Sequence, residues 1–155
     1  MPSFVDVILP KQRRLGEIVE MIHTASLLHD DIIDNSDSRR FLASGNVAFS
    51  NKMAILAGNF LLARASVVIA RLRNVELPST TIALVEGEFM QLKNTASSKS
   101  ADAHYVSFQY YIDETYLRTT SLMSKSCRAT AVLASCNDEV IYATYRFGRS
   151  LGLCF

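Results

Sequence analysis

Three aspartates stand at the end of an apolar segment, where their spacing suits a divalent cation. Residues 23–34 read HTASLLHDDIID, so Asp30, Asp31 and Asp34 form a D-D-x-x-D pattern. In a helix that turns about 100° per residue, His23, Asp30 and Asp34 fall within roughly 40° of one another, and Asp31 lies about 80–100° away. Carboxylates this close repel one another. Magnesium removes the conflict, because one or two carboxylates typically hold it while phosphate oxygens and waters complete its shell.

Two arginines follow in a polar segment, and arginine suits phosphate. Arg39 and Arg40 end the run NSDSRR, and their planar guanidinium groups can donate pairs of hydrogen bonds to phosphate oxygens. Acids and arginines together indicate a site for a metal-bound diphosphate. The alternatives are a solvated acidic helix end and loop arginines paired with Asp37. An EF-hand calcium loop is a poor match, since its Gly and its final Glu are absent at the required offsets.

The pattern of apolar residues predicts that helices position these side chains. Apolar residues of the first segment recur at three- and four-residue spacing, as at Ile18, Ile22, Ala25 and Leu28. With only three prolines and six glycines, the chain favours helices over many short strands. We expect a linker at 97–100. The expected helices span residues 15–34, 47–73, 79–95, 103–135 and 138–155.

The acidic run resembles a family motif, and further motifs follow in order. Residues 23–40 resemble the first aspartate-rich motif of the trans-prenyltransferases, the polyprenyl diphosphate synthases. The closest likeness is to the long-chain synthases of fungi that make the ubiquinone side chain. The resemblance implies an all-α fold, an antiparallel helical bundle of the isoprenoid synthase type. Four more segments are similar to family motifs: NKMAILAGNFLL (51–62), EGEFMQ (86–91), YLRTTSL (116–122) and FGRSLGLCF (147–155).

The resemblance also implies which residues bind the two substrates. His23 and Arg40 match residues that bind isopentenyl diphosphate. Arg39 matches a residue that binds the allylic diphosphate. Arg118 and Thr119 match a Lys-Thr pair that contacts the allylic substrate. The implied reaction joins the two diphosphates into a long all-trans polyprenyl diphosphate.

Metal binding and product length are assigned in the same way. Asp30 and Asp34 match the Mg²⁺ ligands, and Asp31 completes the catalytic motif between them. Ala25 and Ser26 match the positions that limit product length at the floor of the substrate cavity. Because both side chains are small, the resemblance implies an open cavity and a long product.

The sequence departs from the family pattern at several positions. Phe41 stands where a glycine usually follows the arginine pair, and Arg118 replaces a lysine. Asn59 replaces an aspartate, and the stretch 74–86 is about one helical turn short. A G-G-K-x-x-R loop expected before the chain and a second D-D-x-x-D expected after it are missing. Residues 1–155 therefore read as the central part of a single synthase domain, truncated at both ends and about half of it.

These departures leave alternatives to a working enzyme. The chain could be a non-catalytic partner subunit or an inactive fragment of a synthase, and we expect residues 1–155 alone to be inactive. A terpene cyclase would share the helical fold and the first acidic motif, but not the E-G-E and Arg-Arg elements. When complete, the protein is expected to be a homo- or hetero-oligomer.

Composition narrows the remaining possibilities. A net charge of +1 argues against a nucleic-acid partner. No uninterrupted apolar run reaches 18 residues, so no transmembrane segment is expected. Cys127, Cys136 and Cys154 lack zinc spacing and suggest free thiols in a reducing compartment. No targeting peptide is visible in this chain, and the expectation of a mitochondrial protein rests on the resemblance.

Overall fold

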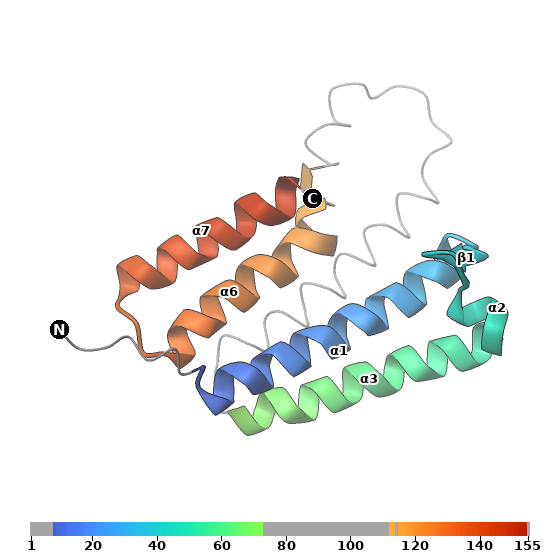
Figure 1. The fold of residues 1–155 in the computed structure, drawn as a ribbon, viewed down its shortest axis with the longest axis horizontal. Helices are drawn as coiled ribbons and strands as arrows, with labels where there is room; N and C mark the ends of the chain where they lie inside the picture. Colours follow the sequence, from blue (N-terminus) through green and yellow to red (C-terminus); the bar gives the residue numbers. More distant parts are fainter. Residues whose placement is uncertain (1–7, 73–111, 114, 155) are drawn as a thin grey trace. The chain divides into compact units, whose positions relative to one another are not determined.

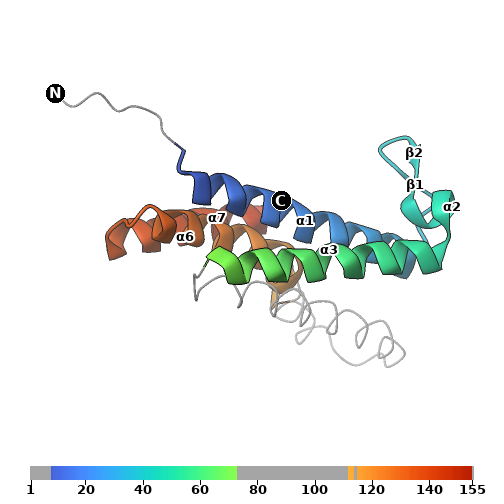
Figure 2. The ribbon, with the colours of Figure 1, turned by 90° about the horizontal axis from the view of Figure 1, so that it is seen from below.

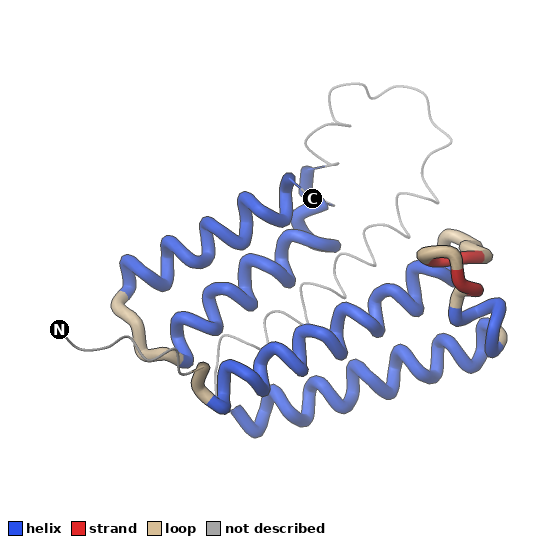
Figure 3. Tube along the Cα trace, in the orientation of Figure 1, coloured by secondary structure: helices blue, strands red, loops and turns tan. Residues whose placement is uncertain are grey.

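The computed structural model describes residues 8–72, 112–113 and 115–154. The chain divides into two compact units, each considered by itself. The first unit is Arg13–Arg73, and the second joins Met1–Gln12 to Asn74–Phe155. Helices make up most of the described residues in both units, and the strands among them are confined to one short hairpin (Figure 3). The prediction of an all-α fold is confirmed.

Two long helices form the body of the first unit. They lie side by side and antiparallel, joined at one end by a hairpin and a short helix (Figures 1 and 2). The two strands pair antiparallel, with Arg39 opposite Leu42 and Ser38 opposite Ala43. The elements in chain order are α1 (Pro10–Ile33), β1 (Ser38–Arg39), β2 (Leu42–Ala43), α2 (Gly45–Phe49) and α3 (Asn51–Leu72).

The helical period of the sequence explains which face of α1 is buried. Leu15, Ile18, Ile22 and Ala25 recur at three- and four-residue spacing, and all four are buried. On α3 a glycine leaves room for a side chain of α1. A Cβ built on Gly58 would lie 2.3 Å from Nε2 of His29, so no larger residue fits there without movement of the imidazole.

The second unit is an antiparallel helix pair preceded by a π-helical turn. The elements are η1 (Tyr116–Thr120), α6 (Ser121–Leu133) and α7 (Asp138–Cys154). The amide of Val140 donates to Oδ1 of Asn137 at 3.0 Å, which caps the start of α7. Glycines on α7 again allow close packing. A Cβ on Gly148 would lie 2.8 Å from the carbonyl oxygen of Met123, and a Cβ on Gly152 would lie 2.7 Å from Cα of Thr120.

Several predicted boundaries are wrong for identifiable reasons. Helix α1 begins at Pro10 rather than residue 15, since proline suits the first turn of a helix. The helix predicted over 47–73 is interrupted at Ser50, whose φ of 90° ends α2 before α3 begins. The hairpin was not predicted. The helix predicted over 103–135 contains the π-helical turn, and the one predicted over 79–95 lies outside the described residues.

Helix α3 bears on the expectation that no segment crosses a membrane. Among the described residues it alone is long and apolar enough to do so, by length and composition only, and 28% of its most apolar window is buried. A core helix of a water-soluble protein can pass the same test. One face of α3 packs on α1 through Gly58. The expectation that no segment crosses a membrane stays a prediction.

Candidate functional site

The acidic residues at the end of α1 occupy two different environments. The backbone amide of Asp34 donates to the carbonyl of Asp30 at 2.8 Å, which extends the helical geometry one residue past Ile33. Asp30 and Asp34 are therefore one turn apart, Asp30 partly exposed and Asp34 exposed. Asp31 is buried. The structure thus separates the middle acid of the motif from the other two, as the helical angle predicted.

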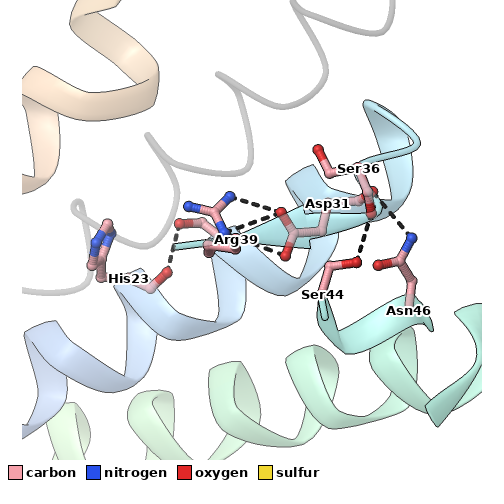
Figure 4. Close-up of polar contacts among 7 residues, drawn as sticks. His23, Asp31, Ser36, Arg39, Ser44 and Asn46 are labelled. Carbon is pink, nitrogen blue, oxygen red and sulfur yellow. Dashed lines mark hydrogen bonds and ion pairs between the residues drawn. The ribbon is translucent and has the colours of Figure 1, made fainter. Parts of the chain in front are cut away.

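Arg39 compensates the buried charge of Asp31. Its Nε lies 3.1 and 3.3 Å from the two carboxylate oxygens, and its Nη2 lies 2.7 Å from Oδ1 (Figure 4). This two-pronged contact between planar groups is the strongest form of side-chain ion pair. The hydrogen bond to Asp31 raises the pKa of Arg39, and the charges of Asp30 and Asp34 add to the effect, while burial opposes it. Arg39 therefore stays cationic.

The segment that follows α1 is also fastened by hydrogen bonds to that helix. The carbonyl oxygen of Asp31 accepts from the amide of Ser36 at 2.8 Å and from Nδ2 of Asn46 at 3.4 Å. The hydroxyl of Ser44, a buried residue, donates to the carbonyl of Ser36 at 2.6 Å (Figure 4). Main-chain and side-chain bonds thus tie the hairpin to the last turn of α1 and to Ser36 just after it, so the hairpin that carries the arginines is held in place.

The tip of the hairpin has an unusual backbone. Arg40 and Phe41 connect the strands, and both have positive φ values, 50° and 67°. Two such residues between antiparallel strands make the kind of turn that prefers Asn-Gly. The left-handed conformation costs a residue with a side chain about 1–2 kcal/mol. Phe41 is fully exposed, so burial does not offset this cost, and Arg40 is also exposed.

Other predicted site residues of the first unit lie on α1. His23 is exposed (Figure 4), and its carbonyl oxygen accepts from the hydroxyl of Ser26 at 2.9 Å. Ala25 is 0% exposed, whereas Ser26 is partly exposed. The two candidate length-limiting residues thus differ in environment, as expected for neighbours on a helix. That His23 acts together with Asp30 stays a prediction.

The predicted Arg118 and Thr119 belong to the second unit. Their backbone lies in the π-helical turn η1, and their side chains lie outside the described part of the structure. Their proposed contact with a substrate therefore remains a prediction.

The sequence did not point to several supporting residues. In the first unit, Ser44 and Asn46 brace the hairpin. In the second unit, Tyr116 of η1 shares a hydrogen bond with Tyr145. A serine before a short helix is a familiar helix-capping signal. Ser44 does precede α2, but its hydroxyl bonds Ser36 instead of the helix. No pattern in the sequence pairs the two tyrosines.

Comparison with known proteins decides the family. The model of the family described as polyprenyl synthetase matches residues 5–155. The chain belongs to the polyprenyl synthetase family. The match favours the prenyltransferase interpretation over a terpene cyclase.

Relatives of the family are similar over almost the whole chain. A "Probable hexaprenyl pyrophosphate synthase, mitochondrial" of Yarrowia lipolytica is 69% identical over 159 residues, which cover 100% of this chain and 35% of the relative. The "Decaprenyl-diphosphate synthase subunit 1" of Schizosaccharomyces pombe is 53% identical over 152 residues, covering 96% and 40%. The chain thus spans well under half the length of these relatives.

A solved structure of the family has the same fold. The octaprenyl pyrophosphate synthase of Helicobacter pylori superposes with a TM-score of 0.81 at 27% sequence identity. The match covers 99% of this chain and 48% of that protein. The fold is therefore the all-α isoprenoid synthase fold, of which this chain represents about half.

Proposed function

We propose that this chain is part of a transferase that condenses isopentenyl diphosphate with an allylic diphosphate. The product would be a long all-trans polyprenyl diphosphate, and the setting would be synthesis of the ubiquinone side chain in mitochondria. The names of the fungal relatives support the reaction class, and the Yarrowia relative is named as mitochondrial. A hydrophobic product and two anionic substrates require a site with both cationic and apolar parts.

One observation carries the proposal. Two acids one turn apart, Asp30 and Asp34, end the same helix whose buried Asp31 fixes Arg39. The charges of both acids act on Arg39, since both raise its pKa. The groups proposed to bind the metal and the anion therefore share one small region of the first unit, which is what a metal-bound diphosphate requires.

The chain's own residues suggest a division of work on the substrates. Arg39 uses Nε and Nη2 to hold Asp31, and the guanidinium carries further donors for a diphosphate oxygen. Its side chain is 42% exposed and can therefore reach solute. Arg40 is exposed at the hairpin tip, and His23 is exposed on α1. In the proposal Arg39 binds the allylic diphosphate, and Arg40 and His23 bind isopentenyl diphosphate.

The acids fit a magnesium site built partly by substrate. Among the described residues no group of three or more His, Cys, Asp or Glu side chains could hold a metal ion by itself. Mg²⁺ commonly takes only one or two carboxylates and completes its shell with substrate phosphate and water. Asp30 and Asp34 suit that role, whereas Asp31 is committed to Arg39. When bound, Mg²⁺ would stabilise the negative charge that develops on the leaving diphosphate.

The chemistry places distinct demands on these residues. The C–O bond of the allylic diphosphate breaks, and the diphosphate leaves with the electron pair. The double bond of isopentenyl diphosphate then forms the new C–C bond, and a proton is lost. Because charge grows on the leaving oxygens, fixed cations stabilise the transition state more than the ground state. Arg39, already held by Asp31, needs little reorganisation to do so.

A catalytically silent partner subunit is the second candidate. The Schizosaccharomyces relative is named as a subunit, which fits a protein that works within a homo- or hetero-oligomer. Departures from the family pattern at Phe41 and Asn59 also leave this possibility open. An activity measurement distinguishes the two candidates.

The test uses a chimera in which residues 1–155 replace the matching segment of the Yarrowia relative. We expect this chimera to elongate an allylic diphosphate with isopentenyl diphosphate. Asp30→Ala and Asp34→Ala should each lower turnover at least about a hundredfold, since each removes several kcal/mol of metal-mediated stabilisation. Asp37→Ala, a change of an exposed acid in the same segment, is the matched control and should stay within about twofold.

The outcomes separate the proposals. Near-normal rates for either Asp30→Ala or Asp34→Ala would contradict the metal assignment. An inactive, folded chimera without further substitutions would favour the silent subunit.

A further inference from the structure

Among the described residues of the second unit, η1 is a π-helical turn that departs from regular α-helix. π-Helical turns are rare and concentrate at functional sites. This one covers Tyr116–Thr120, the segment in which Arg118 and Thr119 match the family's allylic-substrate contacts. An unfavourable backbone of this kind persists only where its surroundings hold it. The contacts that hold η1 therefore bear on the site.

Helix α7 contacts the first residue of the turn. The hydroxyl groups of Tyr116 and Tyr145 lie 2.6 Å apart, a hydrogen bond in which either can donate. One turn further along α7, the guanidinium carbon of Arg149 lies 5.8 Å from the centre of the Tyr116 ring. That distance is within the range of a cation–π interaction. Tyr145 thus contacts the hydroxyl of Tyr116, and Arg149 contacts its ring.

The same helix contacts the last residue of the turn. Thr120 is 0% exposed, and its Cα would lie 2.7 Å from a Cβ built on Gly152. Ser121, the first residue of α6, also contacts the turn, since its hydroxyl donates to the carbonyl of Leu117 at 2.7 Å. Both ends of η1 are therefore held from outside, one by a polar contact and one by close packing.

Tyr145 is well suited to be the fixed end of this arrangement. Burial raises the pKa of Tyr145, and the hydrogen bond to Tyr116 adds to the shift, while Arg149 and a hydrogen bond with Ser124 oppose it. The phenol therefore keeps its proton at neutral pH and the hydroxyl pair remains intact. Among the described tyrosines, Tyr142 on the same helix is exposed and serves as a natural comparison.

We propose that Tyr145, acting through Tyr116, is a positioning residue that holds the turn carrying Arg118 and Thr119 in the geometry needed to bind the allylic diphosphate. This inference rests on the function proposed above. It assigns a role to a residue that touches no substrate itself. Arg149 supports the same turn by holding the ring of Tyr116.

The test compares two substitutions that each remove one hydroxyl from α7. In the chimera, Tyr145→Phe should raise KM for the allylic diphosphate about three- to tenfold, the factor expected for one lost hydrogen bond. KM for isopentenyl diphosphate should change by less than about twofold. The matched control, Tyr142→Phe, should change neither value.

A second variant separates positioning from general loss of structure. Tyr116→Phe removes the same hydrogen bond from the other side and should reproduce the effect of Tyr145→Phe. The double variant should be no worse than either single variant, because both remove one interaction. Hydrogen exchange should quicken in residues 116–120 and stay unchanged in 126–133.

Each failure has a separate meaning. Equal effects of Tyr145→Phe and Tyr142→Phe in an active chimera would overturn the inference and leave the proposed function standing. Equal rises in both KM values, with faster exchange throughout α6, would also overturn it, since they indicate a merely structural role. An inactive chimera would refute the proposed function. In that case the inference is still tested by hydrogen exchange, and an unchanged exchange rate at residues 116–120 in Tyr145→Phe would refute it.

Discussion

Replacing Arg39 by lysine tests whether the ion pair with Asp31 holds the hairpin. Lysine keeps the charge but offers a point donor in place of the planar fork, so it cannot reproduce contacts from both Nε and Nη2. Arg40→Lys is the matched control, because Arg40 is the adjacent arginine and is exposed at the tip. Only the Arg39 substitution should destabilise the protein.

The size of the effect follows from the burial of the two partners. Breaking a fully buried ion pair costs about 3–5 kcal/mol. Asp31 meets that condition, with a side chain 5% exposed, but the Arg39 side chain is 42% exposed. Solvent screening on the arginine side reduces the cost, and lysine restores part of the charge interaction. We therefore expect Arg39→Lys to lower the free energy of unfolding by about 1–2 kcal/mol and Arg40→Lys by less than about 0.5 kcal/mol.

Urea unfolding of the chimera at several pH values is the appropriate assay. The hydrogen bond to Asp31 raises the pKa of Arg39 above its ordinary value. The stability gained from this shift is fully present below the unfolded pKa and is lost only as the pH rises through the folded one. Because that range is strongly alkaline, the difference between the variants should be constant from about pH 6 to 9.

A double-mutant cycle with Asp31→Asn completes the test. If the pair acts as a unit, Asp31→Asn and Arg39→Lys should couple by about 1 kcal/mol. Equal stabilities of the Arg39 and Arg40 variants, or strictly additive effects with Asp31→Asn, would show that the hairpin is held without this pair.

Four further variants are informative in the same chimera. Gly148→Ala should destabilise it by at least about 1 kcal/mol, because the new Cβ meets the backbone of α6. Gly16→Ala should instead stabilise it by about 0.5–1 kcal/mol, because the new Cβ meets nothing within 4 Å. Thermal unfolding measures both effects. Phe41→Gly should add about 1 kcal/mol by relieving the positive φ of an exposed residue, and an unchanged melting temperature would contradict that account. Replacing Ala25 and Ser26 together with Phe should shorten the products seen by chromatography without abolishing the first condensation; an unchanged product would place the cavity floor elsewhere.

The sequence predicted the features that depend on regular helical geometry. The period of α1 correctly gave its buried face, including Ile18 and Ala25. The same geometry set Asp31 apart from Asp30 and Asp34. Such predictions succeed because 3.6 residues per turn fixes direction once a segment is known to be helical. The partner of Asp31 could not be predicted, since it depends on how the chain returns through the hairpin.

The irregular features lacked a signal in the residue types. Positive φ usually points to Gly or Asn, yet here Phe41 and Ser50 adopt it. The φ of 90° at Ser50 divides α2 from α3 without a proline or glycine at the break. The turn η1 was likewise invisible, because its support comes from Tyr145, about thirty residues further along the chain. Tertiary contacts determine these conformations, and local propensity does not.

The π-helical turn has a consequence for how this region tolerates insertions and deletions. A π turn is equivalent to one extra residue within an α-helix, and an α-helix rotates about 100° for each residue. The five residues of η1 therefore rotate the chain by about as much as four residues of α-helix. Loss of a single residue within η1 would restore an unbroken α-helix and leave α6 facing as it does now. The same deletion made inside α6 would rotate the rest of that helix by about 100° and reorient its surface.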